Sequence, residues 1–399
     1  MESRYAKMSI YYGIERVDTM QYVRLGNISD RVSRLGLGCM RLPQMTLPDG
    51  KKDIDDAEAI KLIRAAIDSG INYIDTAYVY GRSEEVVGKA LLDGYRERVI
   101  LVTKLPMSNI TSKEQMQTFF DEELKRLQTD HIDVLHLHNL HKGHWSKVVE
   151  FGALDFLREL KEKGLIKHAA CSMHERIDHL RVVLDAFPWE LVMVQYNYLD
   201  KFNQVGREGV ELIASRGIPM VAMEPLHGGL LAQDVPASIV EAFGDFHPEM
   251  NQAEKSFMWL YNQPEVCVVL SGTSSMEQLE DSLRIFENAQ PGVLSAEDEA
   301  VYDRVRDAWH QMVKVPCTAC AYCMPCPMQV NIPEVFRLYN ETARSSSPQN
   351  WLYTAILVNS GEDVSKCIGC RLCESKCPQF IEIAAELQAA HNTLLPPRS

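Results

Sequence analysis

Residues 99–138 read VILVTKLPMSNITSKEQMQTFFDEELKRLQTDHIDVLHLH, two apolar runs on either side of a more polar segment. The runs, Val99–Lys104 and Ile132–His138, are short and contain β-branched residues, which is typical of buried strands. The segment between them, Ser112–Gln128, repeats apolar residues at helical spacing, and its expected buried face consists of Met116, Phe120, Leu124 and Leu127. The stretch therefore predicts a strand, a helix and a second strand.

The same alternation covers the first 300 residues of the chain. The six other expected strands are Arg34–Gly38, Asn72–Asp75, Ile166–Ser172, Leu191–Tyr196, Ile218–Met223 and Val266–Leu270. One intervening helix, Asp55–Ser69, begins with a capping-box pattern at Asp55 and Glu58 and is followed by Gly70. Eight such units over about 270 residues fit a (β/α)8 TIM barrel. A doubly wound open sheet is the alternative, but no GxGxxG follows the first strand.

Composition limits the partners of the chain. It has 399 residues, 46% of them hydrophobic and 24% charged, with a formal net charge of −14. This acidic balance argues against nucleic acid and against an anionic membrane surface, because phosphates attract basic faces. No segment approaches the ~18 apolar residues of a membrane span. The N-terminal residues mix charges without an apolar run, so we expect no signal peptide and a cytoplasmic protein.

The expected domains are an N-terminal extension at 1–19, the barrel at 20–312 and a cysteine-rich domain at 313–399. Within them, Glu297–Lys314 predicts one more helix. The polar, Ser-rich stretch 344–350 is expected to connect two groups of cysteines.

Eight of the 11 cysteines lie between residues 317 and 377, in two runs. The first is Cys317-x2-Cys320-x2-Cys323-x2-Cys326-Pro, and the second is Cys367-x2-Cys370-x2-Cys373-x3-Cys377-Pro. The second run has the bacterial ferredoxin spacing, and the first is one residue short before its last cysteine. The pattern predicts a small, mainly helical, ferredoxin-like domain with two [4Fe–4S] clusters. Paired zinc knuckles are the alternative, because CxxC pairs also suit tetrahedral zinc.

In two-cluster ferredoxins the last cysteine of each run ligates the other cluster. One expected ligand set is therefore Cys317, Cys320, Cys323 and Cys377, and the other is Cys326, Cys367, Cys370 and Cys373. The three remaining cysteines, Cys39, Cys171 and Cys267, are expected to be small buried hydrophobic residues in strands.

Titratable residues end three neighbouring strands of the expected barrel. Asp75 ends the second strand, Lys104 the third and His138 the fourth, and Tyr80 lies in the loop after Asp75. Barrel chemistry takes place at these strand ends. A free phenol has a pKa of about 10, and a nearby ammonium makes it a better acid at neutral pH. The pattern predicts a proton-transfer site, with His138 placed to hydrogen-bond a carbonyl oxygen. His136 is an alternative to His138, and we expect His131, His141 and His144 at the surface.

These residues resemble the aldo-keto reductase family over about Tyr22–Gln290, and the tail resembles the branch with a C-terminal ferredoxin-like module. The matching motifs are Arg24-Leu-Gly26, Asp75-x4-Tyr80-Gly81, Thr103-Lys104, Ile132–His138, Pro225-Leu-x2-Gly-Leu230 and Gly272-Thr-Ser-Ser-x2-Gln278. The resemblance implies a catalytic tetrad of Asp75, Tyr80, Lys104 and His138. Tyr80 would donate the proton as hydride passes from NADPH or NADH to a carbonyl carbon.

The nicotinamide side departs from the family pattern. Ser172-Met173 stands where the family has Ser-Asn, Met193 stands for a Gln with Gln195 two residues on, and Met223 stands for a stacking aromatic ring. Methionine offers no strong donor or acceptor, which implies a loosely held nicotinamide. The alternative is that these methionines belong to the core. The resemblance also implies cofactor contacts at Gly38, Cys39, Met40, Pro225 and Leu226.

The far end of the dinucleotide is expected on Ser271–Leu283, where a strand runs into the start of a helix. The contacts implied by the resemblance are Gly272, Thr273, Ser275, Gln278, Asp281 and Ser282. No Lys or Arg occurs in this segment. Because a 2′-phosphate favours such a cation, NADH is at least as good a candidate as NADPH.

The leading hypothesis is a soluble NAD(P)H-linked oxidoreductase that reduces a small aldehyde or ketone, or oxidises the alcohol, and carries two [4Fe–4S] clusters. The alternative is electron transfer with a redox protein partner, with the nicotinamide pocket weak or unused. A cluster passes one electron and hydride carries two, so direct communication normally needs a flavin. No flavin signature is found, which favours two separate functions or a structural cluster domain. A third hypothesis is that the protein is an interaction module whose barrel has no catalytic activity.

Overall fold

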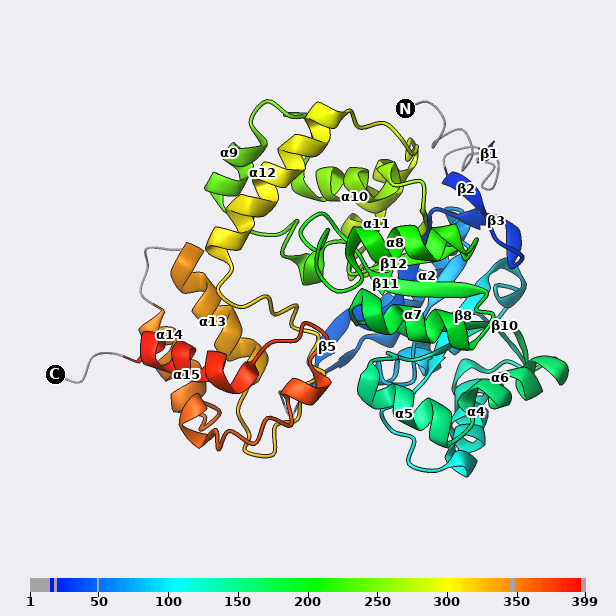
Figure 1. Ribbon diagram of the computed structural model, residues 1–399, viewed down its shortest axis with the longest axis horizontal. Coiled ribbons are helices and arrows are strands. Elements are labelled where there is room, and N and C mark those ends of the chain that lie inside the picture. Colours follow the sequence, from blue (N-terminus) through cyan, green and yellow to red (C-terminus); the bar gives the residue numbers. More distant parts are fainter. Residues whose placement is uncertain (1–14, 18–19, 49, 345–348, 396–399) are drawn as a thin grey trace. The chain divides into compact units, whose positions relative to one another are not determined.

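The computed structural model describes residues 15–17, 20–48, 50–344 and 349–395, and it contains a closed barrel of eight parallel strands (Figure 1). Their order around the barrel is β10-β11-β12-β13-β4-β7-β8-β9. The strands are β4 Leu35–Gly38, β7 Tyr73–Asp75, β8 Ile100–Leu105, β9 Ile132–Leu137, β10 Ile166–Met173, β11 Leu191–Gln195, β12 Met220–Met223 and β13 Val266–Ser271. All eight expected strands are present with ends shifted by at most two residues, so the TIM barrel prediction is confirmed.

The described chain divides into two compact units. The first comprises Met1–Pro225 and Glu254–Leu294, and the second comprises Leu226–Ala253 and Ser295–Ser399. The helices that follow the barrel strands are α2 Asp56–Asp68, α3 Ser83–Ala90, α4 Lys113–Leu127, α5 Lys142–Glu150, α6 Ala153–Glu162, α7 Ile177–Ala186, α8 Gly206–Ser215, α10 Gln252–Asn262 and α11 Met276–Phe286.

Local sequence explains where these helices begin and end. Asp55 caps α2 by accepting hydrogen bonds from the backbone N–H groups of Ala57 and Glu58, but its own N–H bonds the Pro43 carbonyl oxygen, so only the Asp55 half of the predicted capping box is seen. Helix α4 ends at Gln128, which has a left-handed backbone with φ 53°. The expected face of α4 is partly wrong, because Glu123 is buried beside Met116, Phe120 and Leu127 while Leu124 is only half-buried.

The barrel interior is apolar and is continuous with a short antiparallel sheet at the N-terminus. This sheet consists of β1 Glu15–Val17, β2 Met20–Leu25 and β3 Ser29–Ser33. Val23, Leu25 and Val32 of this sheet pack in one cluster with the inward side chains of the barrel strands. All three cysteines outside the tail are buried as expected, but Cys39 lies in the short 3-10 helix η1 Cys39–Arg41 rather than in a strand.

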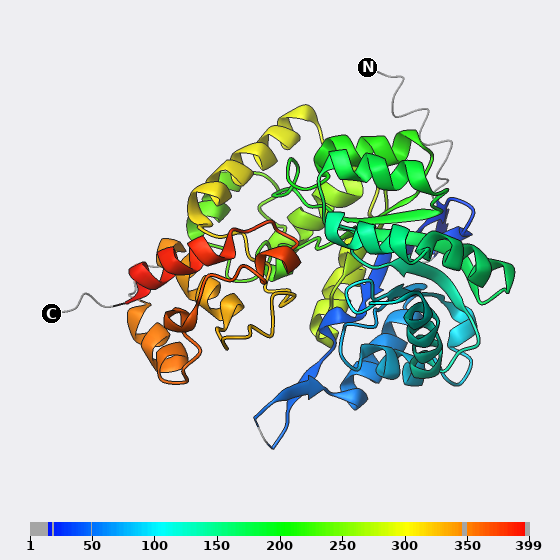
Figure 2. The ribbon, with the colours of Figure 1, turned by 60° about the horizontal axis from the view of Figure 1, so that its bottom comes forward.

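A two-stranded hairpin extends from the barrel between β4 and α2 (Figure 2). It consists of β5 Gln44–Thr46 and β6 Lys52–Ile54. The side chains of β5 are exposed.

The second unit is helical. Its helices are α9 Ala237–Phe243, α12 Ala296–Met312, α13 Ile332–Arg344, α14 Asn350–Tyr353 and α15 Ile383–Leu394, with short turns η3 His227–Gly229, η4 Thr354–Val358, η5 Val364–Lys366 and η6 Glu374–Lys376. Helix α12 confirms the helix expected at residues 297–314, and it begins with a capping box of Ser295 and Asp298. Most of the polar connection and of the N-terminal extension lies outside the described residues. Within the described part of the chain, no helix has the length and apolar character needed to cross a bilayer.

Candidate functional site

The barrel brings the four expected catalytic residues to the carboxyl ends of three neighbouring strands. Lys104 Nζ donates hydrogen bonds to Asp75 Oδ1 at 2.6 Å and to the Thr76 carbonyl oxygen at 2.7 Å. The same ammonium lies 4.9 Å from the ring centroid of Tyr80. The Tyr80 and His138 rings meet edge to face, with their centroids 5.9 Å apart. A cation, a phenol and an imidazole therefore share one small space.

Burial sets the charge states of this group. Asp75 and Lys104 are each 1% exposed. Burial raises the pKa of the Asp75 carboxyl, and Lys104 opposes this rise by its charge and its hydrogen bond. Burial and the Lys104 charge hold the pKa of His138 well below its ordinary value. His138 is consequently a neutral imidazole near pH 7, which can donate one N–H hydrogen bond.

The other histidines near the fourth strand differ from their expected surface positions. His136 is fully buried, and burial lowers its pKa to about 3. His141 and His144 are only half-exposed, with ring centroids 3.8 Å apart, and burial lowers the pKa of each to about 4. All three histidines expected at the surface, His131 included, are thus only partly exposed, and the loop after β9 folds back so that His144 Nδ1 bonds the Asn139 carbonyl oxygen at 2.8 Å.

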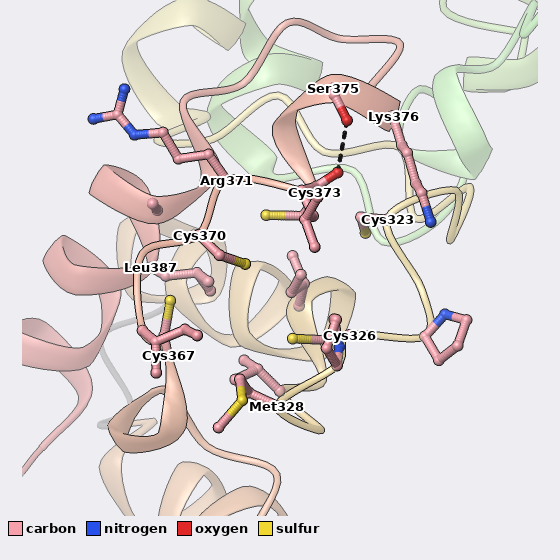
Figure 3. Close-up of a pocket in the computed structure, with 17 residues that line it drawn as sticks. Cys323, Cys326, Met328, Cys367, Cys370, Arg371, Cys373, Ser375, Lys376 and Leu387 are labelled. Atoms are coloured by element: carbon pink, nitrogen blue, oxygen red, sulfur yellow. Dashed lines mark hydrogen bonds between the residues drawn. The ribbon is translucent and has the colours of Figure 1, made fainter.

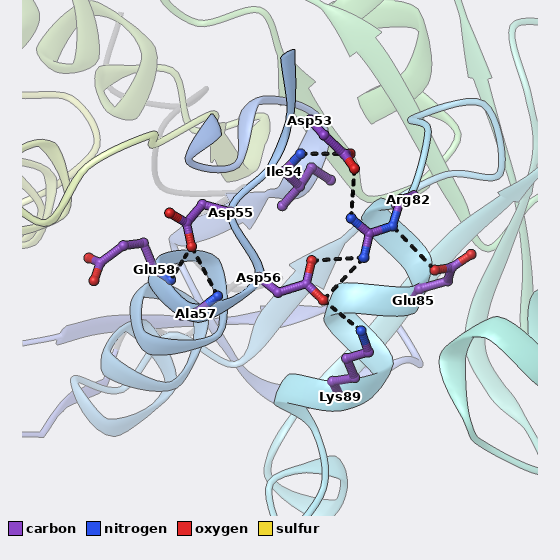
Figure 4. A network of polar contacts seen from close by, with 9 residues as sticks. All are labelled: Asp53, Ile54, Asp55, Asp56, Ala57, Glu58, Arg82, Glu85 and Lys89. Atoms are coloured by element: carbon purple, nitrogen blue, oxygen red, sulfur yellow. Dashed lines mark hydrogen bonds and ion pairs between the residues drawn. The ribbon is translucent and has the colours of Figure 1, made fainter. Parts of the chain in front are cut away.

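The loop that carries Tyr80 is held by an ion-pair network two residues further on (Figure 4). Arg82 contacts Asp53 of the hairpin and Asp56 of α2, each at 2.9 Å. Lys89 of α3 contacts the other oxygen of Asp56 at 2.6 Å. The network joins the hairpin base, two helices and the Tyr80 loop. Sequence analysis missed it, since its residues come from three separate segments.

Two buried carboxyl groups, those of Glu84 and Glu123, lie near Lys104. The Thr103 hydroxyl, next to Lys104, donates to Glu84 Oε1 at 2.6 Å, and Arg126 Nη1 lies 3.4 Å from Glu84 Oε2. Glu123 is fully buried, and neither of its carboxyl oxygens has a hydrogen-bond partner among the described residues. Burial, then the neighbouring Glu84, raises the pKa of Glu123 well above its ordinary range.

The expected nicotinamide residues divide into two groups. Ser172 lies at the barrel rim, where its hydroxyl accepts a hydrogen bond from the Asn139 backbone N–H at 3.0 Å. Gln195 is also buried, and its amide donates to Asp200 at 2.7 Å. Met193, by contrast, packs in the apolar barrel interior, with Met223 at the edge of the same cluster. This placement favours the core alternative for Met193.

The remaining positions at this rim are spread over three segments. Gly38 ends β4, while Cys39 and Met40 lie in η1. The Cys39 carbonyl oxygen accepts a hydrogen bond from Ser83 at 2.8 Å. Pro225 follows β12, and Leu226 begins the second unit.

The segment expected to hold the far end of the dinucleotide leads from β13 into α11. Ser275 caps α11 by accepting from the Gln278 N–H, and Gln278 Oε1 accepts from the Ser274 N–H at 2.9 Å. Thr273 and Ser282 are buried on either side of the Ser271 hydroxyl.

Two arginines missed by sequence analysis lie beside this segment. Arg284 is paired with both Asp281 and Glu254. A Cβ atom on Gly272 would lie 4.0 Å from Arg41 Cδ, and the Arg41 guanidinium lies 3.9 Å from the carboxylate of Glu224. Neither arginine was found because one lies just past the segment and the other comes from the opposite end of the barrel sequence.

The tail cysteines line two pockets in the second unit. Cys326, Cys367, Cys370 and Cys373 line the first, a cavity of about 120 Å³. Figure 3 shows the sulfur atoms of these four cysteines directed toward a common space. This donor set fits a [4Fe–4S] cluster, whose iron atoms are held by Cys thiolates. Cys323, which the spacing of the two runs assigns to the other ligand set, also lines this pocket, so the pairing of the ligands stays a prediction.

Cys317, Cys320, Cys323 and Cys377 line the second pocket. Its donor set also fits a cluster, but it measures only about 20 Å³, room for roughly one water. Among the described residues, no group of three or more His, Cys, Asp or Glu side chains gathers closely enough for a single metal ion.

Comparison with known proteins agrees with both parts of the chain. Residues 34–300 match the aldo/keto reductase family model, and residues 316–381 match the 4Fe-4S dicluster domain model. An uncharacterised oxidoreductase of Bacillus subtilis is 27% identical over 296 residues, which is 66% of this chain and 90% of that protein. The NADH-specific methylglyoxal reductase of Escherichia coli is 25% identical, over 66% of this chain and 93% of that protein.

A solved structure also indicates similarity to the aldo-keto reductases. The holo form of an aldo-keto reductase from Bacillus halodurans superposes with a TM-score of 0.58 at 26% identity, covering 74% of this chain and 96% of that chain. The family model alone spans more than half of the 399 residues. The protein is therefore an oxidoreductase of the aldo/keto reductase family with a C-terminal 4Fe-4S dicluster domain.

Proposed function

We propose that the protein transfers hydride between NADH or NADPH and a small aldehyde or ketone, with Tyr80 as proton donor, and that its tail carries two [4Fe–4S] clusters. The observation that supports the catalytic part is the buried Lys104 ammonium, bonded to Asp75 at 2.6 Å and 4.9 Å from the Tyr80 ring. An ammonium at this distance favours the phenolate form and makes the phenol a better acid.

The bound nicotinamide would supply the hydride that adds to the carbonyl carbon. The carbonyl oxygen takes the Tyr80 proton, so the product is the alcohol and Tyr80 becomes a phenolate stabilised by Lys104. His138, neutral because burial and Lys104 lower its pKa, donates a hydrogen bond that orients the carbonyl oxygen. Solvent then returns a proton to Tyr80. The reverse sequence oxidises an alcohol.

We propose NADH rather than NADPH as the preferred reductant. A 2′-phosphate is usually bound by an arginine or lysine, and Arg284, beside the expected adenosine site, is already paired with two carboxylates. The methylglyoxal reductase relative is named as NADH-specific and as acting on a small carbonyl compound. Fluorescence titration is expected to give tighter binding of NADH, and tenfold tighter binding of NADPH would contradict this choice.

The test of the catalytic role is Tyr80→Phe compared with Tyr78→Phe. Tyr78 lies in the same loop, but its hydroxyl bonds Glu122 at 2.9 Å, away from the site. Because positioned acid catalysis contributes about 10²–10⁴-fold, Tyr80→Phe should lower kcat for carbonyl reduction by at least about 100-fold. Tyr78→Phe should stay within a few-fold of the parent. Equal activity of Tyr80→Phe and the parent would refute the role.

Cluster content is tested by iron and sulfide analysis after anaerobic purification. Two [4Fe–4S] clusters require about eight iron atoms and eight sulfides per chain. Zinc without sulfide would contradict the cluster assignment and favour the zinc-knuckle alternative.

One observation favours electron transfer as a second candidate function. Cys370, which lines the first pocket, is exposed, so a cluster bound there lies close to solvent and to any redox partner. If this is the main function, one-electron mediators should reduce the clusters rapidly, while NADH alone should leave their visible absorbance unchanged.

A further inference from the structure

The two cysteine pockets differ in the charges around them. Arg371 and Lys376 line the pocket of Cys326, Cys367, Cys370 and Cys373 (Figure 3). Among the described residues no Asp or Glu lines it, and the nearest acidic partner is Glu374, whose carboxylate lies 4.0 Å from Arg371 Nε. The pocket of Cys317, Cys320, Cys323 and Cys377 has no charged side chain in its lining. We call the first the cationic pocket and the second the neutral pocket.

The pockets also differ in their access to water. Two apolar side chains of the cationic pocket, Ile368 and Leu372, are 69% and 55% exposed. Cys370 of the cationic pocket is itself exposed, whereas the four cysteines of the neutral pocket, Cys317, Cys320, Cys323 and Cys377, are all only half-exposed. A cluster in the cationic pocket is therefore the better hydrated of the two.

Both differences act on cluster reduction in the same direction. A [4Fe–4S] core held by four thiolates is an anion, and reduction adds one more negative charge. Nearby cations and solvent stabilise that added charge, while an uncharged, buried setting opposes it. Net charge and solvent exposure are accordingly among the factors that set cluster potentials.

Given the two clusters of the proposed function, we propose that the cluster of the cationic pocket has the higher reduction potential and receives the first electron. Cys323 lines both pockets, so the two clusters would be neighbours and an electron can pass between them. The electron then resides at the pocket that opens beside Cys370, Ile368 and Leu372. This makes the cationic pocket the exit for single electrons.

The test is a redox titration of the full-length, anaerobically purified protein, followed by electron paramagnetic resonance. Two separate midpoint potentials are expected. Lys376→Gln should move the higher midpoint to a more negative potential, and by more than it moves the lower one, because Lys376 lines the cationic pocket alone; since Lys376 is exposed, the substitution should leave the fold intact. Lys376→Arg keeps the charge and should retain the parent value. The shift should shrink as salt is added, since exposed charges are screened.

The matched control is Arg304→Gln, which removes one positive charge from an exposed position of α12 that lines neither pocket. It should move neither midpoint. With two clusters present, a single shared midpoint, or a shift of the lower midpoint in Lys376→Gln that equals or exceeds that of the higher one, would overturn the inference. If chemical analysis finds fewer than two clusters, the proposed cluster content fails instead, so the two failures are distinguishable.

Discussion

The Lys104–Asp75 pair links stability to catalysis through the same atoms. Both side chains are 1% exposed and their charged groups are 2.6 Å apart. Lys104→Met leaves the Asp75 carboxylate buried without its counter-charge, and breaking a buried pair in this way costs about 3–5 kcal/mol. We expect the single variant to lose both activity and stability, measured by carbonyl reduction and urea unfolding.

The double variant Asp75→Asn, Lys104→Met separates the two effects. It removes both charges, so it should recover most of the lost stability while remaining inactive. If the single variant unfolds at the same urea concentration as the parent, the charges are not as isolated from water as the structure shows.

Glu123 predicts an unusual dependence of stability on pH. Its folded pKa is raised by burial and by Glu84, so the folded state binds more protons than the unfolded state above about pH 4.5. Stability must therefore fall as pH rises from there through the folded pKa. Glu123→Gln removes the titratable carboxyl group. The free energy of unfolding of this variant should therefore fall less between pH 5 and pH 8 than that of the parent. Urea unfolding at pH 5 and pH 8 measures this change. An equal change in the free energy of unfolding for the variant and the parent would contradict the prediction.

The sequence allowed the positions of the polar residues at the strand ends to be predicted, but not the burial of Glu123. Asp75, Lys104 and His138 follow apolar runs, and parallel strands bring such positions together. Glu123 stands in the charged stretch Asp121-Glu-Glu-Leu-Lys-Arg126, which is typical of a solvated face. Its three-residue spacing from Phe120 places it on the buried stripe, but a hydrophobicity pattern favours the adjacent Leu124.

At the scale of elements, the Arg82 network ties the hairpin to the loop of Tyr80. Its ion pairs are half-exposed, so Arg82→Met should cost only about 1 kcal/mol of stability. Freed from Asp53 and Asp56, the loop should hold Tyr80 less well, and we expect kcat to fall several-fold with little change in the KM for NADH. Arg82 thus acts as a positioning residue.

The control for Arg82→Met is Lys61→Met, which breaks the exposed pair of Lys61 with Glu58 on α2. It should leave kcat unchanged. Arg82→Lys keeps one charge and should restore part of the activity. A fall in stability without any change in kcat would show that the network supports the fold alone.

The strands could be predicted because each is a local apolar run, whereas the grouping of helices could not. Residues 226–253 lie between two barrel strands, yet they form one compact unit with α12. The contact is made by rings far apart in sequence, such as Phe243 and Tyr302 with centroids 5.9 Å apart. No short pattern indicates such a pairing. The expected boundaries at 20–312 and 313–399 stay a prediction.

At the scale of the whole molecule, each unit has an apolar core of its own. The tail core includes Val330, Phe336, Leu357 and Leu387, and six of the eight tail cysteines pack against it. Small cores often depend on bound metal for stability. Removing the clusters by oxidation and chelation should therefore destabilise the tail while the barrel stays folded.

Limited proteolysis with mass spectrometry is the measurement. New cleavage sites are expected between residues 317 and 377, and sites in the barrel should be as resistant as before. Cleavage that begins in the barrel strands would show that the barrel depends on the clusters. The untreated holoprotein, handled without oxidant, is the control.

The proposed exchange of fourth ligands between the two cysteine runs has a consequence for biosynthesis. The neutral pocket needs Cys377 from the second run, and the cationic pocket needs Cys326 from the first. Neither run can complete a ligand set while the other is still inside the ribosome. Cluster insertion must therefore follow translation of both runs, and a frameshift that removes the second run would cost the cell both clusters at once.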